Sequence, residues 1–294
     1  SRGLGDVYKR QDLKAAKILA DREGKTLSMP AFIWTQGETD HQDRKTREWY
    51  REKMEKLIRD INHDARAVTG QKNDVVCFGY QVGSHLNYYQ FNPTDYPAIA
   101  LEQLDMALEK DSQYVMTTPM YHFEYSDGVH LTAPMSRLYG EYVGYVMKKV
   151  LLDGADWKPV HPLNHKIRKS GKGWTVEVAF YAPCPPLVLD TKTVDDPGNY
   201  GFSLVGAEGE DIAIKSVRLV GKNAVQLLTE KDPGKGRLRY GMTINEHRPS
   251  GPRTGARGCL RDSQGDEVKA HIQGKDYRMD NWCPFFDYSL SKGH

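Results

Sequence analysis

Apolar residues recur with two different periods along the chain, and the change of period divides it into two parts. In the first part, short apolar runs alternate with segments in which apolar residues are spaced by three and four. The runs predict buried strands over 29–34, 75–80 and 114–117, and the spaced segments predict helices over 12–22, 43–68, 97–108 and 134–152. This alternation predicts an α/β sheet with helices on both faces.

After about Trp157 the period changes to two, which is typical of half-buried strands. Period-two runs cover 174–180, 211–219 and 223–228, with glycines and prolines between them. The pattern predicts an all-β, sandwich-like part. We place the boundary within 154–163, which gives an α/β domain over 12–156 and a β-rich accessory domain over 157–294. The basic run from Lys166 to Lys172 is predicted to be a solvated turn.

Composition narrows the function classes. Of 294 residues, 39% are hydrophobic and 27% charged, and no apolar run approaches about 18 residues, so the sequence predicts no membrane span. Lys and Arg total 41 against 39 Asp and Glu, a balance that argues against a nucleic-acid partner. The cysteines have no C-x-x-C spacing and the histidines no H-E-x-x-H spacing, so no metal site is predicted.

The first eleven residues, SRGLGDVYKRQ, differ from the rest of the chain. They lack an initiating Met and the charged-then-apolar pattern of a signal peptide. Because VYKRQ resembles a translated sequencing adaptor, we expect residues 1–11 to be a non-native tail and the chain to be truncated at its N-terminus. The missing signal pattern would then say nothing about location.

Two polar loops follow predicted strands, at the edge where open α/β sheets bind ligands. The first is WTQGETD, in which Gly37 permits a tight turn and Gln36 and Glu38 supply hydrogen-bonding groups. The second is DGVHLT, directly before the last predicted helix. An Asp three residues before a His can hold one imidazole nitrogen, so Asp127 would orient His130 as a general base. Each loop alone could be an ordinary turn, but the pair predicts an active site.

Together the two loops resemble the W-x-Q-G-E and D-x-x-H blocks of the SGNH (GDSL-type) hydrolases that include sialate O-acetylesterase and acetylxylan-esterase-like enzymes. The resemblance implies a three-layer, flavodoxin-like hydrolase domain. It also implies removal of acyl groups, usually acetyl, from carbohydrates by a serine mechanism, with no metal or other cofactor. It assigns His130 as base and Asp127 as its orienting acid. Gln36, Gly37 and Glu38 would line the active-site wall, with Gln36 in the oxyanion region; in some relatives Glu38 instead orients the histidine.

The resemblance covers about residues 12–153 and lacks one component. The family's nucleophile lies in a Gly-Asp-Ser-like block well before the Q-G-E block, whereas Gly5-Asp6 is followed here by Val7. The block that donates an oxyanion-hole glycine is also missing. Because a serine hydrolase needs a hydroxyl next to its base, we expect this polypeptide alone to be inactive and its parent to be an esterase. Ser84 and Ser126 are the serines to consider as substitutes.

Residues around the second predicted strand and the D-x-x-H loop are candidate substrate contacts. They are Ser84, His85 and Tyr121, in loops that are rich in aromatic residues on which sugars can stack. Core packing is the alternative explanation for these aromatic residues.

The C-terminal stretches 251–266 and 281–286 resemble a segment that follows the hydrolase domain in some bacterial relatives. We expect it to pack against the α/β part, with Arg253, Arg257 and Trp282 near the site. Cys259 and Cys283 either form a disulfide, if the parent is exported, or are two buried free thiols.

The sequence therefore predicts a bacterial carbohydrate O-acetylesterase, secreted or periplasmic, that acts on an acylated carbohydrate. The alternative is a non-catalytic carbohydrate-binding protein built on the same scaffold. The sequence makes no prediction of oligomeric state.

Overall fold

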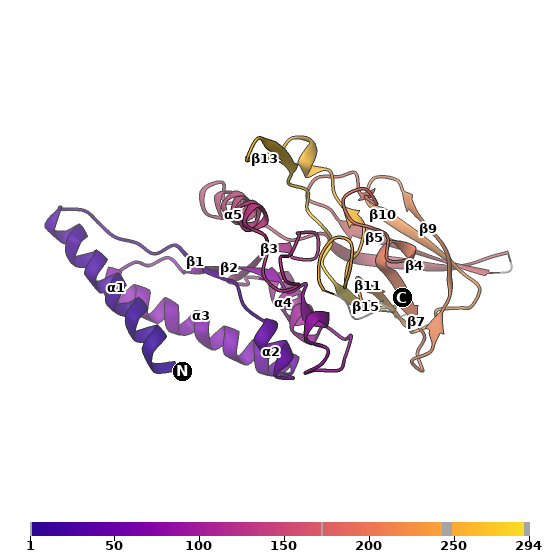
Figure 1. Cartoon of the computed structure of the whole chain (residues 1–294), viewed down its shortest axis with the longest axis horizontal. Coiled ribbons are helices and arrows are strands. Elements are labelled where there is room, and N and C mark those ends of the chain that lie inside the picture. Colours follow the sequence, from indigo (N-terminus) through magenta and orange to yellow (C-terminus); the bar gives the residue numbers. More distant parts are fainter. Residues whose placement is uncertain (1, 172, 243–248, 291–294) are drawn as a thin grey trace.

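The computed structural model describes residues 2–171, 173–242 and 249–290, and Figure 1 shows an elongated molecule with an α/β part beside a β part. The elements of the α/β part are α1 (Arg2–Arg22), β1 (Ala31–Trp34), α2 (Glu38–Gln42), α3 (Arg47–Thr69), β2 (Val76–Gln81), the short 3-10 helix η1 (His85–Tyr88), α4 (Ala98–Leu108), β3 (Tyr114–Pro119), α5 (Ala133–Met147) and the π-helical turn η2 (Lys148–Leu152). Within the described residues, no helix is long and apolar enough to cross a membrane.

The three strands of this part form a parallel sheet in the order β1-β2-β3. Successive side chains of a strand point to opposite faces. Cys77 of β2 joins a cluster that contains residues of α3 and α4, whereas its neighbour Phe78 packs with Val146 of α5. Figure 1 shows α5 on one side of the strands and α3 on the other. Helices therefore cover both faces, as the alternating pattern predicted.

Two helix boundaries differ from the sequence prediction. α1 begins at Arg2, so the helix predicted to start at residue 12 extends through most of the expected tail. The helix predicted over 43–68 begins at Arg47, because Thr46 has extended backbone and its Oγ1 accepts a hydrogen bond from the Trp49 N–H at 3.2 Å. Gly70 ends α3 with φ at 73°, as expected for a C-terminal glycine.

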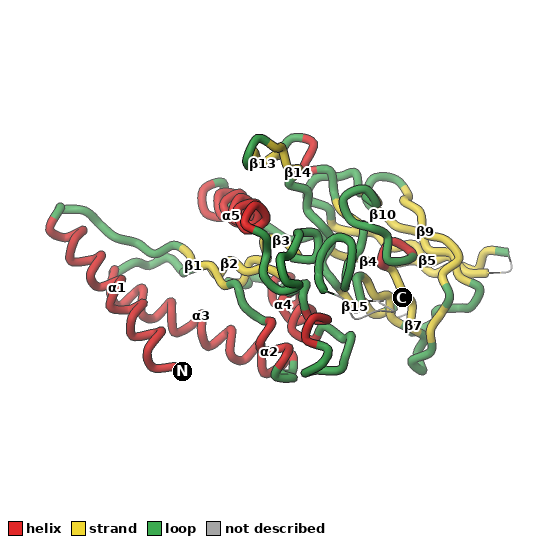
Figure 2. The backbone as a smooth tube through the Cα atoms, viewed as in Figure 1, coloured by secondary structure: helices red, strands yellow, loops and turns green. Residues whose placement is uncertain are grey.

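The β part follows η2 and consists of strands joined by loops and short 3-10 turns, as Figure 2 shows. Its strands are β4 (His161–Ser170), β5 (Gly173–Tyr181), β6 (Val188–Leu189), β7 (Phe202–Val205), β8 (Asp211–Ile212), β9 (Ile214–Val220), β10 (Ala224–Thr229), β11 (Arg237–Tyr240), β12 (Leu260–Arg261), β13 (Lys269–Ile272), β14 (Lys275–Arg278) and β15 (Phe286–Ser289), with 3-10 turns η3 (Asn199–Gly201) and η4 (Gln264–Asp266). Two sheets have four strands each, in the orders β4-β5-β10-β9 and β15-β11-β7-β8, and two pairs, β12-β6 and β13-β14, complete the part.

The prediction of a turn from Lys166 to Lys172 was wrong for residues 166–170, whereas Gly171 lies in a turn. Residues up to Ser170 belong to β4, which pairs antiparallel with β5. Ile167 is partly buried, whereas Lys166 and Arg168 both point to the other face of the strand and are exposed. The main-chain pairing with β5 therefore outweighs the polar composition that suggested a turn.

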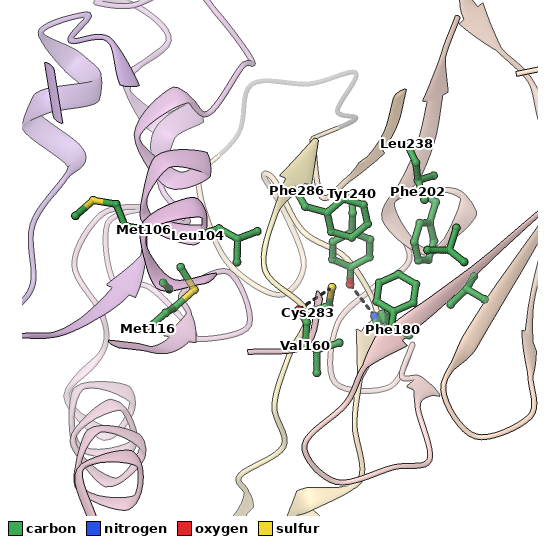
Figure 3. Close-up of a cluster of buried hydrophobic side chains, with 14 of the residues drawn as sticks. Leu104, Met106, Met116, Val160, Phe180, Phe202, Leu238, Tyr240, Cys283 and Phe286 are labelled. Atoms are coloured by element: carbon green, nitrogen blue, oxygen red, sulfur yellow. Dashed lines mark hydrogen bonds between the residues drawn. The ribbon is translucent and has the colours of Figure 1, made fainter. Parts of the chain in front are cut away.

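One hydrophobic cluster extends through both parts of the molecule (Figure 3). It contains Leu104 and Met116 from the α/β part and residues of both four-stranded sheets, such as Phe180 and Tyr240. Figure 3 shows Cys283 between these two groups. The change from helices to strands falls between Leu152, at the end of η2, and His161, at the start of β4, and the two parts share a core across it.

Candidate active site

Three loops meet at one edge of the parallel sheet. Residues 35–37 follow β1, residues 82–84 follow β2, and residues 120–132 connect β3 to α5. Because the strands are parallel, these loops leave from the same edge, where open α/β sheets carry ligand sites.

Asp127 and His130 form a hydrogen-bonded pair in the loop after β3. Nδ1 of His130 lies 2.7 Å from Oδ2 of Asp127, while Oδ1 accepts from the main-chain N–H of His130 at 2.7 Å and of Val129 at 2.9 Å. The main-chain hydrogen bond from His130 is the largest of the effects that hold the pKa of Asp127 well below its usual range. A carboxylate can only accept, so it favours the tautomer with the proton on Nδ1 and leaves Nε2 free to take a proton. The His130 side chain is 79% exposed, so a ligand can reach it.

Close contacts fix the turn that carries this pair. Gly128 has φ at 86°, and a Cβ there would lie 2.6 Å from Oδ1 of Asn87 and 2.9 Å from Pro249. At the other end of the turn, both the main-chain N–H and the hydroxyl of Ser126 donate to the carbonyl of His130, at 2.8 Å and 2.9 Å. The turn therefore needs glycine and packs against η1 and the β part.

The Gln36–Gly37 turn after β1 is equally constrained. Gly37 has φ at 152°, and a Cβ there would lie 2.6 Å from Val82. The side-chain amide of Gln36 donates to Oδ2 of Asp40 at 2.7 Å, and the Gln36 carbonyl accepts from Gln103 at 3.1 Å. The amide expected in the oxyanion region is thus already hydrogen-bonded to a carboxylate.

Glu38, at the start of α2, is held by a tyrosine of the neighbouring strand. The hydroxyl of Tyr80 lies 2.8 Å from both carboxylate oxygens. Burial raises the pKa of Glu38, while the hydrogen bond from Tyr80 opposes the increase. The pKa of Tyr88 is raised first by burial and then by the charges of Glu38 and Asp127. Both predicted loops therefore lie close enough to act on one tyrosine of η1.

The three candidate substrate contacts are buried. Ser84, His85 and Tyr121 have exposed fractions of 0%, 1% and 0%, so none presents a surface to a ligand in this structure. Burial, followed by the charge of His41, lowers the pKa of His85 to about 3. These residues support the loops from inside instead.

No nucleophile is paired with the His130 ring in residues 2–171, 173–242 and 249–290. The nearest serine in sequence, Ser126, uses its hydroxyl on the His130 carbonyl. The four cysteines are free, so Cys259 and Cys283 are unpaired thiols, and burial raises the pKa of Cys259 to about 12. The same described ranges contain no cluster of three or more His, Cys, Asp or Glu side chains suited to a metal ion.

The C-terminal segment packs against the α/β part, as predicted. The Tyr121 hydroxyl donates to the Cys283 carbonyl at 2.8 Å, and Trp282 stacks on His122 with ring centroids 5.3 Å apart. The arginines have other partners: Arg253 forms an ion pair with Asp195, and Arg257 donates to the carbonyl of the same residue at 2.8 Å.

Sequence reasoning missed Gln103, which joins two of the loops. Its Nε2 donates to the Gln36 carbonyl, and its Oε1 accepts from the Val82 N–H at 2.9 Å. The available signal was a glutamine within the apolar helix 97–108, because a buried amide needs hydrogen-bond partners. Tyr80 was missed because no pattern at the end of a strand distinguishes a tyrosine that donates a hydrogen bond to Glu38 from one that packs in the core.

Comparison with known families agrees with the resemblance drawn from the two loops. Residues 5–148 match the family model described as carbohydrate esterase, sialic acid-specific acetylesterase. A search of curated proteins gives no significant match.

Proposed function

We propose that the chain provides the acid–base side of a carbohydrate O-acetylesterase, because residues 5–148 match the family model of the sialic acid-specific acetylesterases. The observation that carries the proposal is the 2.7 Å contact between Asp127 and the exposed His130 at the carboxyl edge of the sheet. His130 is the general base and Asp127 holds its tautomer and stabilises the imidazolium.

In this mechanism Nε2 of His130 removes the proton from an attacking hydroxyl, whose oxygen bonds to the acetyl carbonyl carbon. The proton then passes to the sugar oxygen as the ester bond breaks, and water releases acetate from the acyl-enzyme. Gln36, Gly37 and Glu38 line the site. The side-chain amide of Gln36 can stabilise the oxyanion only if its hydrogen bond to Asp40 breaks. Main-chain N–H groups are the alternative donors.

The mechanism needs an attacking hydroxyl that the described residues do not supply. Ser126 is committed to the His130 carbonyl, and Ser84 is buried. We therefore propose that the nucleophile lies outside the described residues and that the described part of the chain alone does not turn over substrate.

The architecture expected for such an enzyme is also part of the proposal. The α/β domain over 12–156 would have a three-layer, flavodoxin-like layout, and the domain over 157–294 would be a β-sandwich. Supporting the sandwich, Val178 of β5 and Leu238 of β11 come from different four-stranded sheets and lie in one buried cluster. A secreted or periplasmic location in a bacterium completes the proposal.

The test compares O-acetylated sialic acid with the same sugar lacking the acetyl group, by isothermal titration calorimetry. Recognition of the acetyl group should make the acetylated sugar bind about tenfold more tightly, since a small group that fills a pocket contributes roughly 1–3 kcal/mol. Acetate release is measured in parallel for the chain and for His130→Gln. We expect no release that depends on His130.

Each other outcome has a defined meaning. Equal affinity for the two sugars favours the rival, a carbohydrate-binding protein without a role for the acetyl group. No binding of either sugar refutes the proposed function. Release of acetate that is lost in His130→Gln would establish an esterase and refute the external nucleophile, and Ser126→Ala would then show whether Ser126 attacks.

A further inference from the structure

A single residue of the β part contacts the loops that follow two strands of the parallel sheet. Phe285 is fully buried. Its ring stacks on Tyr121 after β3, with centroids 5.2 Å apart and an interplanar angle of 18°, and meets His85 after β2 edge-on at 5.7 Å. The ring also lies where a side chain at residue 241 would be, because a Cβ on Gly241 would come within 2.2 Å of it.

The main chain of Phe285 is held by the last residue of β2. Gln81 is fully buried, and its Nε2 donates to the Phe285 carbonyl at 2.9 Å while its Oε1 accepts from the Phe285 N–H at 2.6 Å. This reciprocal pairing spans 204 positions of the sequence. It fixes the backbone as well as the ring of Phe285 against the sheet edge.

The contacts of Phe285 continue toward each part of the candidate site. On one side, the His85 ring meets His41 of α2 at 5.5 Å, and α2 begins at Glu38. On the other side, Tyr121 begins the loop in which the Tyr125 hydroxyl donates to the Met120 carbonyl at 3.2 Å. Residue 125 also bridges to residue 131, next to His130.

We propose that Phe285 is a positioning residue for the candidate active site. It acts through His85 and Tyr121 and holds the loops of Glu38 and His130 in register with each other. The proposal rests on the proposed function for the role of these loops. It makes the β part necessary for the geometry of the site, in addition to the stability of the fold.

The chain offers a matched control in the next residue. Phe286 is 3% exposed, but its ring contacts are Phe180, Phe202 and Tyr240, all within the β part. Phe285→Leu and Phe286→Leu each remove one buried ring. Only the first variant removes ring contacts to the site loops.

The experiment uses the full chain and two measurements on each variant. Histidine-ring NMR reports the environment of His130, and calorimetry gives the affinity for O-acetylated sialic acid. We expect both variants to unfold at lower urea concentration. Phe285→Leu should also shift the His130 ring signals and weaken sugar binding about tenfold, because small displacements of positioned groups have large effects. Phe286→Leu should leave the His130 ring signals in place and the affinity for the sugar within about twofold of that of the unmutated chain.

The proposal would be overturned if the changes in the His130 signals and in the sugar affinity were equal in the two variants. It would also be overturned if these changes simply followed the loss in free energy of unfolding. If Phe285→Leu does not fold, Phe285→Met keeps most of the volume without the ring and is compared with Phe286→Met. If the unmutated chain binds no acetylated sugar, the proposed function fails. The His130 signals of the two variants still decide whether Phe285 positions the turn.

Discussion

Acid should destabilise this protein through a histidine that is buried without a hydrogen-bond partner. His85 is 1% exposed, and among the described residues neither ring nitrogen has a hydrogen-bond partner. Burial lowers its pKa to about 3 in the folded chain, whereas the unfolded chain has the ordinary value of about 6.5. The unfolded state therefore takes up the proton first. Above about pH 6.5 the His85 ring is neutral in both states and the free energy of unfolding keeps its full value. It decreases as the pH falls toward 3.

The magnitude follows from the distance between the pH and the unfolded pKa. At pH 5, about 1.5 units below 6.5, protonation of the unfolded state lowers the free energy of unfolding by about 2 kcal/mol; at pH 7 the effect is about 0.2 kcal/mol. His85→Leu removes this contribution. We expect its free energy of unfolding to fall less between pH 7 and pH 5 than that of the unmutated chain, by about 2 kcal/mol.

Urea unfolding followed by tryptophan fluorescence at the two pH values measures this difference. The reasoning is refuted if His85→Leu keeps the pH dependence of the unmutated chain. The ring would then be able to take up a proton in the folded protein.

Two further predictions concern the site loops. Gly128→Ala should lower the free energy of unfolding by about 1–3 kcal/mol in thermal unfolding, because φ is 86° and the new Cβ meets Asn87. Gly140→Ala is the control: it lies in open space on α5 and should stabilise the chain by up to about 1 kcal/mol. Equal effects of the two substitutions would contradict the account. Tyr80→Phe removes the hydroxyl that donates to Glu38 and should raise the pKa of that carboxyl further in an NMR titration; an unchanged or lower pKa would contradict the assigned hydrogen bond.

The parts of the site that the sequence predicts are those formed by near neighbours. Asp127 and His130 are three positions apart, so a turn is enough to bring carboxylate and imidazole together, and the structure has that contact. The hydrogen bond between Gln36 and Asp40 is equally local but was not predicted. A glutamine before a glycine has no preference for one of several acidic partners.

The parts that could not be predicted depend on distant residues. His85 and Tyr121 looked like loop residues open to substrate, but both are buried and pack against Phe285 of the C-terminal segment. The pairing of Gln81 with Phe285 has no local signal in either segment. The periods of three to four and of two predicted the type of most elements and the place where helices give way to strands. They could not predict that both parts would share one core.

The central claim is that Asp127 fixes His130 as a general base at a site for acetylated carbohydrate. Long-range nitrogen–proton NMR of the His130 ring tests it most directly, with and without O-acetylated sialic acid. The account predicts that the ring, in its neutral form, carries its proton on Nδ1, that Asp127→Asn loses this preference, and that the Nε2 signal shifts saturably when the acetylated sugar is added. A ring with its proton on Nε2, or an Nε2 signal that does not respond to the sugar, would contradict it.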